Sequence, residues 1–390
     1  MKTNGAKILL FFVIFVILLT GCQNDSSSNS TGESNTEVKS IKLPIEYDPS
    51  DPKHVESLFW LSDQRVLIFT ETFKNSSYLI YDYSEEKIID TGSIPVKMNS
   101  NAAINLVISE IDKNHYLITN RFDLKEFYLW QNTDGNVNIR PIIAEDIFPN
   151  FSINKNIVFF AGIPSSSDSV QLYKIQEENT ISLMKEKSIS LSDLGIPENG
   201  KLFEIAFVNE NDFVYRWTTG TSTSISSCGV YSLDKMKIKT SSSFGSSFDS
   251  DEDVKLLKRG DSVFLEKNPN DRFVFFNANG EAYTIEGMEA DNVAIPPLLA
   301  TSTGEWLAYN SDLTYRDDET FTWTVLKPTD LATKEEWIIE KPYYYIPDDD
   351  FCNVAIAITK EKEPELVFIS KSRPHFGNPD SWALYVVSRK

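Results

Sequence analysis

Short apolar runs alternate with short polar turns along the chain from residue 55 onward. The runs are about four to eight residues long and rich in Val, Ile, Phe, Tyr and Trp, whereas the turns are rich in Asn, Asp, Gly and Ser. This alternation is typical of β-strands joined by hairpins. We find no segment in which apolar residues keep the 3.6-residue helical period over ten or more positions. The pattern therefore predicts an all-β protein.

The runs are grouped into a repeating unit. Each unit begins with a strand, a polar turn and a second strand, followed by an aromatic-rich third strand and usually a fourth. Repeats of roughly 40–50 residues that hold four short strands are typical of β-propeller blades. We count seven units and therefore predict a β-propeller of seven four-stranded blades, with six blades as the alternative. The first turns of the units lie at residues 62–65, 112–114, 154–156, 209–212, 259–261, 302–305 and 359–365.

The seventh unit has no fourth strand. The chain ends at Lys390, directly after the third strand of this unit, while residues 41–47 have strand character and belong to no unit. We therefore predict that residues 41–47 complete the last blade and close the ring. Pro44 fits an outer edge strand, where its missing N–H is tolerated.

A different pattern marks the first 22 residues. Lys2 and Lys7 precede an unbroken apolar run over residues 8–19, and Cys22 follows. As a helix this run would span about 18 Å, which is short of the roughly 30 Å hydrocarbon core of a bilayer. The length favours a signal peptide over a transmembrane helix. An ordinary secretory signal cleaved at another residue is the alternative.

The segment ends in Leu19-Thr20-Gly21-Cys22, which resembles the lipobox of bacterial lipoproteins. The resemblance implies that residues 1–21 are a cleaved signal peptide and that Cys22 becomes the first residue of the mature protein. It also implies that Cys22 is diacylated, with fatty acids such as palmitate. The protein would then be anchored at the extracytoplasmic face of the cell membrane.

The tract after Cys22 is rich in Ser, Asn and Thr, and Val38 is its only aliphatic residue up to residue 40. Such a tract buries too little apolar surface to offset its ordering entropy. We predict that residues 22–40 form a flexible tether with an r.m.s. reach of roughly 25 Å. No change of composition divides residues 41–390, so we predict that they form a single β-propeller domain.

With the lipobox in front and the strand–turn–strand rhythm over residues 41–390, the chain resembles the TolB-like and YqgU-like β-propeller lipoproteins of bacteria. The resemblance implies an envelope protein, and it implies six blades where the repeats count seven. It indicates no particular ligand.

The charge excludes one class of partner. The chain has 57 acidic and 37 basic residues, and its net charge is -20. An excess of this size repels nucleic acid phosphates and anionic headgroups, so we expect no nucleic acid partner. A generic solvated acidic surface accounts for the charge equally well.

Cysteine and histidine give no catalytic pattern. Cys228 and Cys352 could form a disulfide if the fold brings their Cα atoms within about 7 Å, and two buried free thiols are the other outcome. The histidines have no partner at i+2 or i+4 and are interpreted as surface or packing residues. Because no nucleophile elbow, HExxH motif, P-loop or dinucleotide fingerprint occurs, we predict no catalytic residue and no cofactor. The histidines are His54, His115 and His375.

Two acidic clusters are candidates for metal sites. Asp249, Asp251 and Asp253 alternate like the first ligands of a calcium loop, but position six is Val254 rather than Gly and position twelve is Gly260 rather than Glu. These residues are weak calcium candidates, and we predict no metal site. We interpret the second cluster as solvated loop charge. It consists of Asp348, Asp349 and Asp350.

Tryptophans spread over the units could bind carbohydrate, but most lie in predicted strands, where packing between neighbouring blades is the favoured role. Three consecutive tyrosines, Tyr343, Tyr344 and Tyr345, cannot all face one core. We predict that at least one is exposed or packs across a blade junction. The tryptophans are Trp60, Trp130, Trp217, Trp306, Trp323, Trp337 and Trp382.

Two functions fit these features. The first is a membrane-anchored, non-catalytic propeller that binds or scaffolds a protein or an envelope component such as the cell wall, an inference from fold alone. The alternative is an envelope hydrolase or lyase with its site in the central channel. Convergent acids and a perturbed pKa in a deep axial pocket would favour the enzyme, and a flat mouth with exposed aromatic side chains would favour the binding module.

Overall fold

All regular secondary structure in the described part of the chain is β-strand, so the all-β prediction is confirmed. The computed structural model describes residues 35–45, 53–62, 64–99, 105–165, 168–177, 180–219, 224–248, 254–259, 262–267, 273–277, 279–285, 299–300, 305–310, 320–327, 330–340, 355–359, 364–372 and 381–390. The strands are β1 (Thr36–Lys42), β2 (His54–Ser62), β3 (Arg65–Glu71), β4 (Ser76–Asp82), β5 (Lys87–Ile94), β6 (Leu106–Asp112), β7 (His115–Asn120), β8 (Asp123–Thr133), β9 (Asn136–Ile143), β10 (Asn150–Ile153), β11 (Phe159–Ile163), β12 (Val170–Glu177), β13 (Ile181–Ile189), β14 (Gly200–Phe207), β15 (Asp212–Thr219), β16 (Ser224–Ser232), β17 (Lys237–Phe248), β18 (Val254–Arg259), β19 (Ser262–Lys267), β20 (Phe273–Phe276), β21 (Ala282–Ile285), β22 (Leu299–Ala300), β23 (Leu307–Asn310), β24 (Thr320–Lys327), β25 (Asp330–Glu340), β26 (Ala355–Thr359), β27 (Glu365–Ser372) and β28 (Ser381–Arg389).

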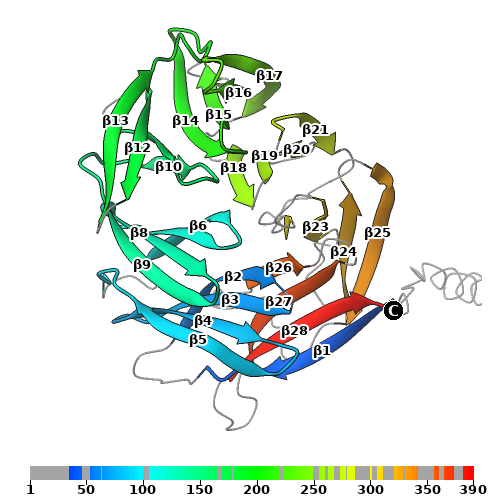
Figure 1. The fold of residues 1–390 in the computed structure, drawn as a ribbon. Helices are drawn as coiled ribbons and strands as arrows, with labels where there is room; N and C mark the ends of the chain where they lie inside the picture. Colours follow the sequence, from blue (N-terminus) through cyan, green and yellow to red (C-terminus); the bar gives the residue numbers. More distant parts are fainter. Residues whose placement is uncertain are drawn as a thin grey trace, which may run out of the picture. The chain divides into compact units, whose positions relative to one another are not determined.

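The described strands form six sheets (Figure 1). Five sheets have four strands, and in four of these each strand pairs with the next along the chain: β2–β5, β14–β17, β18–β21 and β22–β25. The fifth contains β26, β27, β28 and β1. The sixth has eight strands, because β6–β9 and β10–β13 are joined by a short parallel pairing of Ile181 with Ile142 and of Ser182 with Ile143.

Burial changes from the first to the last strand of a sheet. In the second strand β3 every residue from Val66 to Glu71 is buried, whereas in the fourth strand β5 only Ile94 is buried. A strand that is apolar on both faces needs cover on both faces, and the neighbouring sheets provide it. Trp130, for example, packs with Phe69 and Tyr78 between the sheet β2–β5 and the strands β6–β9.

The strand β1 pairs with β28, but it begins earlier than the predicted segment 41–47. Its register runs from Thr36 opposite Arg389 to Lys42 opposite Ala383. Polar side chains do not prevent ladder pairing, since the backbone alone makes these hydrogen bonds. The pairing ends at Pro44, which has no N–H to donate. The apolar residues of the predicted segment are nevertheless buried with Trp382 and Leu384; they are Ile41, Leu43 and Ile45.

The folded unit begins at Asn35, inside the segment predicted as tether. Asn35 Nδ2 donates to Glu336 O at 2.7 Å, and Ile338 N donates to Asn35 Oδ1 at 2.9 Å. Thr36 is buried and its hydroxyl donates to Ile338 O at 2.8 Å. These contacts hold the start of β1 against the preceding sheet as well as against β28.

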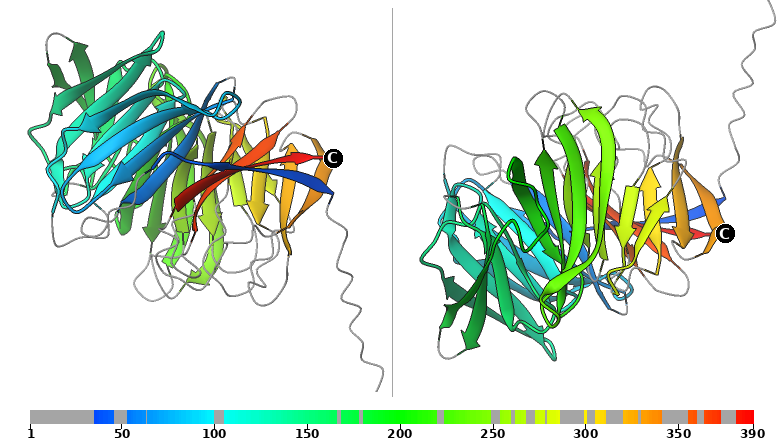
Figure 2. Two further views of the ribbon diagram at one scale, coloured as in Figure 1. Left: turned by 90° about the horizontal axis from the view of Figure 1, so that it is seen from below. Right: turned by 90° about the horizontal axis from the view of Figure 1, so that it is seen from above.

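Antiparallel pairing places the turns of each sheet at two opposite ends. We call the end with the turns between first and second strands and between third and fourth strands the turn face. The other end, with the second-to-third turns and the links from sheet to sheet, is the connector face. Lys390 N donates to Asn35 O at 3.1 Å, so the start of β1 lies beside the end of β28 at the turn face (Figure 2).

Backbone hydrogen bonds tie the two kinds of turn on the turn face together. In four successive units a residue at or just beyond the end of the third strand donates its N–H to a carbonyl of the first turn, at 2.8 to 3.0 Å. The turn face is therefore a set of paired, mutually braced turns. The donor and acceptor pairs are Tyr83 with Gln64, Asn132 with Asn114, Ile175 with Val158 and Leu233 with Asn211.

Candidate interaction faces

The first turn of the sheet β14–β17 is shaped by Asn209. Its Oδ1 accepts hydrogen bonds from Asn211 N and Asp212 N, both at 2.7 Å, and its Nδ2 donates to Asp212 Oδ2 at 2.8 Å. Asparagine favours turns because its short side chain can bond the backbone two or three residues on. The turn is therefore fixed by its own residues.

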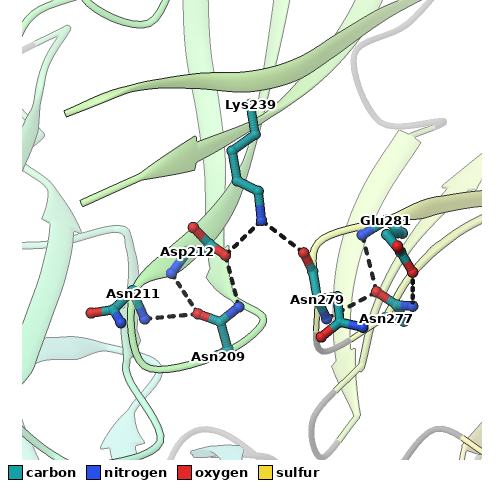
Figure 3. Close-up of polar contacts among 7 residues, drawn as sticks. All are labelled: Asn209, Asn211, Asp212, Lys239, Asn277, Asn279 and Glu281. Atoms are coloured by element: carbon teal, nitrogen blue, oxygen red, sulfur yellow. Dashed lines mark hydrogen bonds and ion pairs between the residues drawn. The ribbon is translucent and has the colours of Figure 1, made fainter. Parts of the chain in front are cut away.

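A lysine links this turn to the next sheet (Figure 3). Lys239 Nζ, from β17, donates to Asp212 Oδ2 at 2.9 Å and to Asn279 O at 2.8 Å. The turn that contains Asn279 is held in the same way as the first, because Asn277 Oδ1 accepts from Asn279 N and from Glu281 N. The polar cluster in Figure 3 thus joins the sheets β14–β17 and β18–β21 at the turn face.

Side chains on the first strands join further neighbours. Ile205 N donates to Asn150 Oδ1 and Phe207 N donates to Ser152 Oγ, both at 3.0 Å. At the adjoining turn Asn154 Nδ2 donates to Glu210 O at 2.7 Å. These bonds connect β10 with β14, so the polar groups along the first strands hold the sheets together.

A partly buried ion pair lies between β14–β17 and β18–β21. Arg216 Nε donates to Glu204 Oε2 at 2.6 Å, and the same oxygen accepts Leu256 N at 2.9 Å. The guanidinium also lies 4.8 Å from the centre of the Phe203 ring. Because Glu204 bonds the backbone of the next sheet, this pair serves to join the sheets.

His115 is paired with a neighbour in its own turn. Its Nδ1 lies 2.9 Å from both carboxylate oxygens of Asp112. Burial would raise the pKa of Asp112, but hydrogen bonds from His115 and from Asn114 N, together with the charge of Lys155, hold that pKa below its usual value. Among the described residues, no group of three His, Cys, Asp or Glu side chains could hold a metal ion.

Several candidates named from the sequence lie outside the described residues, so the structure neither unites nor separates them. Cys228 is described: it is buried and free, and burial raises the pKa of its thiol to about 12. A thiol of that kind is chemically inert. His54 lies at the start of β2. The candidates outside the described residues are Cys22, Asp249, Asp251, Asp253, Tyr343, Tyr344, Tyr345, Asp348, Asp349, Asp350, Cys352 and His375.

The predicted packing role of the tryptophans is confirmed for six of the seven. Trp306, Trp323 and Trp337 form a cluster with Leu366 and Tyr385 from the sheet that follows. Trp60 is half-buried and belongs to the first strand β2. The six buried tryptophans are Trp130, Trp217, Trp306, Trp323, Trp337 and Trp382.

Sequence reasoning missed one feature of the connector face. Asn120, which is 3% exposed, accepts Phe122 N at 2.7 Å and Asp123 N at 3.2 Å on its Oδ1. Its Nδ2 donates to Lys97 O at 2.5 Å. This turn presents the Phe122 side chain, which is 56% exposed, to solvent. The sequence did contain a signal for this turn, because asparagine between two predicted strands favours a turn.

No family model and no curated protein matches the sequence. Among solved structures, the β-propeller domain of Myceliophteria thermophila Cps50 (Swd1) covers 91% of this chain and is itself covered completely, with 11% identity and a TM-score of 0.54. The fold is a β-propeller. The propeller is also similar to streptogramin B lyase (10% identity, 90% and 97% coverage, TM-score 0.47) and to Kluyveromyces lactis Hsv2 (12%, 86% and 99%, 0.46).

These similarities concern the fold, since the identities are too low to carry a function. Within the described residues of the propeller, no helix has the length and apolar character needed to cross a bilayer.

Proposed function

We propose that this protein is a lipid-anchored, extracytoplasmic lipoprotein whose β-propeller is a non-catalytic binding or scaffold module for a protein or an envelope component. In this proposal the propeller has seven four-stranded blades. Strands β6–β9 and β10–β13 count as two blades in contact, and β1 completes the last blade.

The observation that carries the binding role is the rigid display of exposed side chains by internally bonded turns. Asn120 on the connector face and Asn209 and Asn277 on the turn face each accept two backbone N–H groups. Prearranged surface groups lose little freedom when a partner binds. Such faces suit recognition of another macromolecule.

The anchor is supported by the Leu19-Thr20-Gly21-Cys22 pattern and by the position of Asn35. The folded unit starts at Asn35, which lies on the rim of the turn face beside Lys390. Residues 23–34 would give a flexible spacer an r.m.s. reach of roughly 20 Å. A diacylated Cys22 would therefore keep the propeller close to the membrane.

The anchor is tested by replacing Cys22 with Ala. Mass spectrometry of the wild-type protein should show a mature chain that begins with a diacylated Cys22. The Cys22→Ala protein should carry no lipid and should not be processed at this site, while Cys228→Ala, the matched cysteine control, should be lipidated and processed like the wild type. A wild-type chain that starts at another residue, or carries an unmodified Cys22, would contradict the anchor.

A further inference from the structure

A buried arginine side chain in the sheet β14–β17 has an unused donor. Arg216, on β15, is 4% exposed, and its Nε donates to Glu204 Oε2 at 2.6 Å. Its Nη1 is also buried, but no hydrogen-bond partner for this atom exists within the described residues. A buried N–H on a cationic group that lacks an acceptor costs free energy of folding. An acceptor at Nη1 would remove this cost.

A β-bulge brings further side chains to this guanidinium. The register of β14 with β15 shifts between Leu202 and Glu204, so Phe203 and Glu204 both lie opposite Arg216. The guanidinium lies 4.8 Å from the centre of the Phe203 ring, and Lys201 Nζ lies 4.8 Å from the same centre. Both cations therefore contact one aromatic ring. We call this group the Arg216 site; it consists of Lys201, Phe203, Glu204 and Arg216.

The Arg216 site lies between two first strands and has one open side. Glu204 Oε2 also accepts Leu256 N of β18, the first strand of the next sheet, at 2.9 Å. Exposure rises from the buried Arg216 through Phe203, which is half-buried, to Lys201, which is exposed. The side of Lys201 is therefore the route by which a small solute reaches the guanidinium.

The charges of the Arg216 site do not balance. It holds two cations and one carboxylate, and a single oxygen of this carboxylate accepts from both Arg216 Nε and Leu256 N. Within the described part of the chain, Lys201 contacts the Phe203 ring and forms no ion pair. The facing strand β18 has three basic residues and no acidic one in its sequence, VKLLKR. Glu198, the acid that precedes Lys201 in the chain, is exposed to solvent.

We propose that the Arg216 site binds a small carboxylate anion. A guanidinium is planar and presents its N–H groups in pairs that match the two oxygens of a carboxylate. Glu204 occupies the Nε side, so the anion is accepted on the Nη1 side, and Lys201 Nζ balances its charge. A spherical ion such as chloride matches this fork less well. The inference goes beyond the proposed function and depends neither on the lipid anchor nor on a macromolecular partner.

The test compares sodium formate with sodium chloride at equal ionic strength, using the full-length protein. An anion of three non-hydrogen atoms binds with a Kd of about 1 mM or weaker, because the free energy gained per atom is limited. We expect the melting temperature to rise with formate and then level off, since a ligand of the folded state stabilises it. Chloride should give a smaller rise that reflects screening alone. The NMR signal of isotope-labelled formate should broaden when the protein is added.

Two variants and two matched controls locate the effect. Arg216→Lys keeps the charge but loses the fork, and Lys201→Gln removes the exposed cation, so each should weaken formate binding about tenfold. The control Arg140→Lys alters a guanidinium that already has two side-chain acceptors. The control Lys174→Gln alters an exposed lysine of β12. Both controls should respond to formate like the wild type.

Loss of the formate response in both variants, with both controls intact, would support the anion site. An equal rise in formate and in chloride would overturn it, because screening alone would then act, or a carboxylate of the chain itself would already fill the site. An unchanged formate response in Lys201→Gln would also overturn it. This second variant is decisive if Arg216→Lys fails to fold, since Lys201 is exposed and its replacement leaves the buried contacts in place.

Discussion

At the scale of single residues, asparagine determines the shape of the turns. Asn209 and Asn277 on the turn face and Asn120 on the connector face each receive two backbone N–H groups. The composition of these segments, which are rich in asparagine, is enough to predict turns. Which of several neighbouring asparagines caps a turn depends on local backbone geometry, and that is not visible in the sequence.

Replacing Asn209 with Ala should lower the free energy of unfolding by about 1–2 kcal/mol, because two backbone donors near the buried Asp212 lose their acceptor. Asn211→Ala is the matched control, since the backbone of Asn211 rather than its side chain makes the turn contacts. The control should cost at most about 0.5 kcal/mol. Urea unfolding monitored by tryptophan fluorescence measures both variants, and equal losses would contradict the capping role.

A buried carboxylate predicts a pH dependence of stability. Glu71 is 1% exposed, and burial raises its pKa above 4.5 although Asn105 N and Leu106 N donate to it. The folded protein therefore binds a proton at Glu71 more tightly than the unfolded chain does. The contribution to stability is full below the ordinary pKa and is lost as pH rises through the raised pKa.

Glu71→Gln should reduce the fall in the free energy of unfolding between pH 4.5 and neutrality, because the neutral amide does not titrate. The exposed Glu85→Gln is the control and should keep the wild-type slope. Urea midpoints over this pH range give the comparison. A slope that Glu71→Gln leaves unchanged would show that another group causes the dependence.

At the scale of elements, strand existence and order followed from the apolar rhythm, whereas some boundaries did not. The run from Ile157 was expected to start a strand, yet β11 starts at Phe159. Ile157 has a φ of 55°, and Asn154 Oδ1 accepts both Val158 N and Phe159 N. A side-chain cap thus extended the turn against the strand preference of isoleucine, which rarely adopts positive φ.

The first strand shows the same limit. The polar sequence Thr36-Glu37-Val38-Lys39-Ser40 carries no apolar alternation, and its pairing is imposed by the free edge of β28. Only the continuation through Ile41, Leu43 and Ile45 was predictable from the sequence, because its apolar side chains alternate and are buried. Local composition cannot report an edge supplied by residues far away in the sequence.

Deleting residues 36–42 should lower the free energy of unfolding by several kcal/mol, since it removes a ladder of hydrogen bonds and the buried Ile41. It should also expose the edge of β28 and promote aggregation. Deleting residues 26–32 is the control and should cost almost nothing. Equal stability of the two deletion proteins would mean that β1 contributes no stability to the propeller.

At the scale of the whole molecule, the propeller fold was predictable and the side-chain links between its sheets were not. The repeat of hairpins is a global pattern that chance variation at single positions does not hide. The link between Lys97 and the turn at Phe122, for example, depends on the side chains of Asn120 and Glu126. Such links are set by strand register and by the packing of neighbouring sheets, which no local motif encodes.

The net charge of -20 predicts a salt effect on the entire propeller. Like charges repel one another most strongly in the compact state, and added salt screens that repulsion. The urea midpoint should therefore rise when sodium chloride is increased from low to physiological concentration. A midpoint that falls would show that attractive ion pairs, such as that of Lys239 with Asp212, outweigh the overall repulsion.

The pairing of β1 with β28 also has a mechanical consequence. The N-terminal segment leaves the propeller at Asn35, at the end of β1 that lies opposite Arg389. A pull along the axis of β1, applied at its first residue, would load the hydrogen bonds from Thr36 to Lys42 in shear, all at once. A pull across the sheet would instead break them one by one. The antiparallel pairing of β1 with β28 therefore resists tension along the strand far better than tension across it.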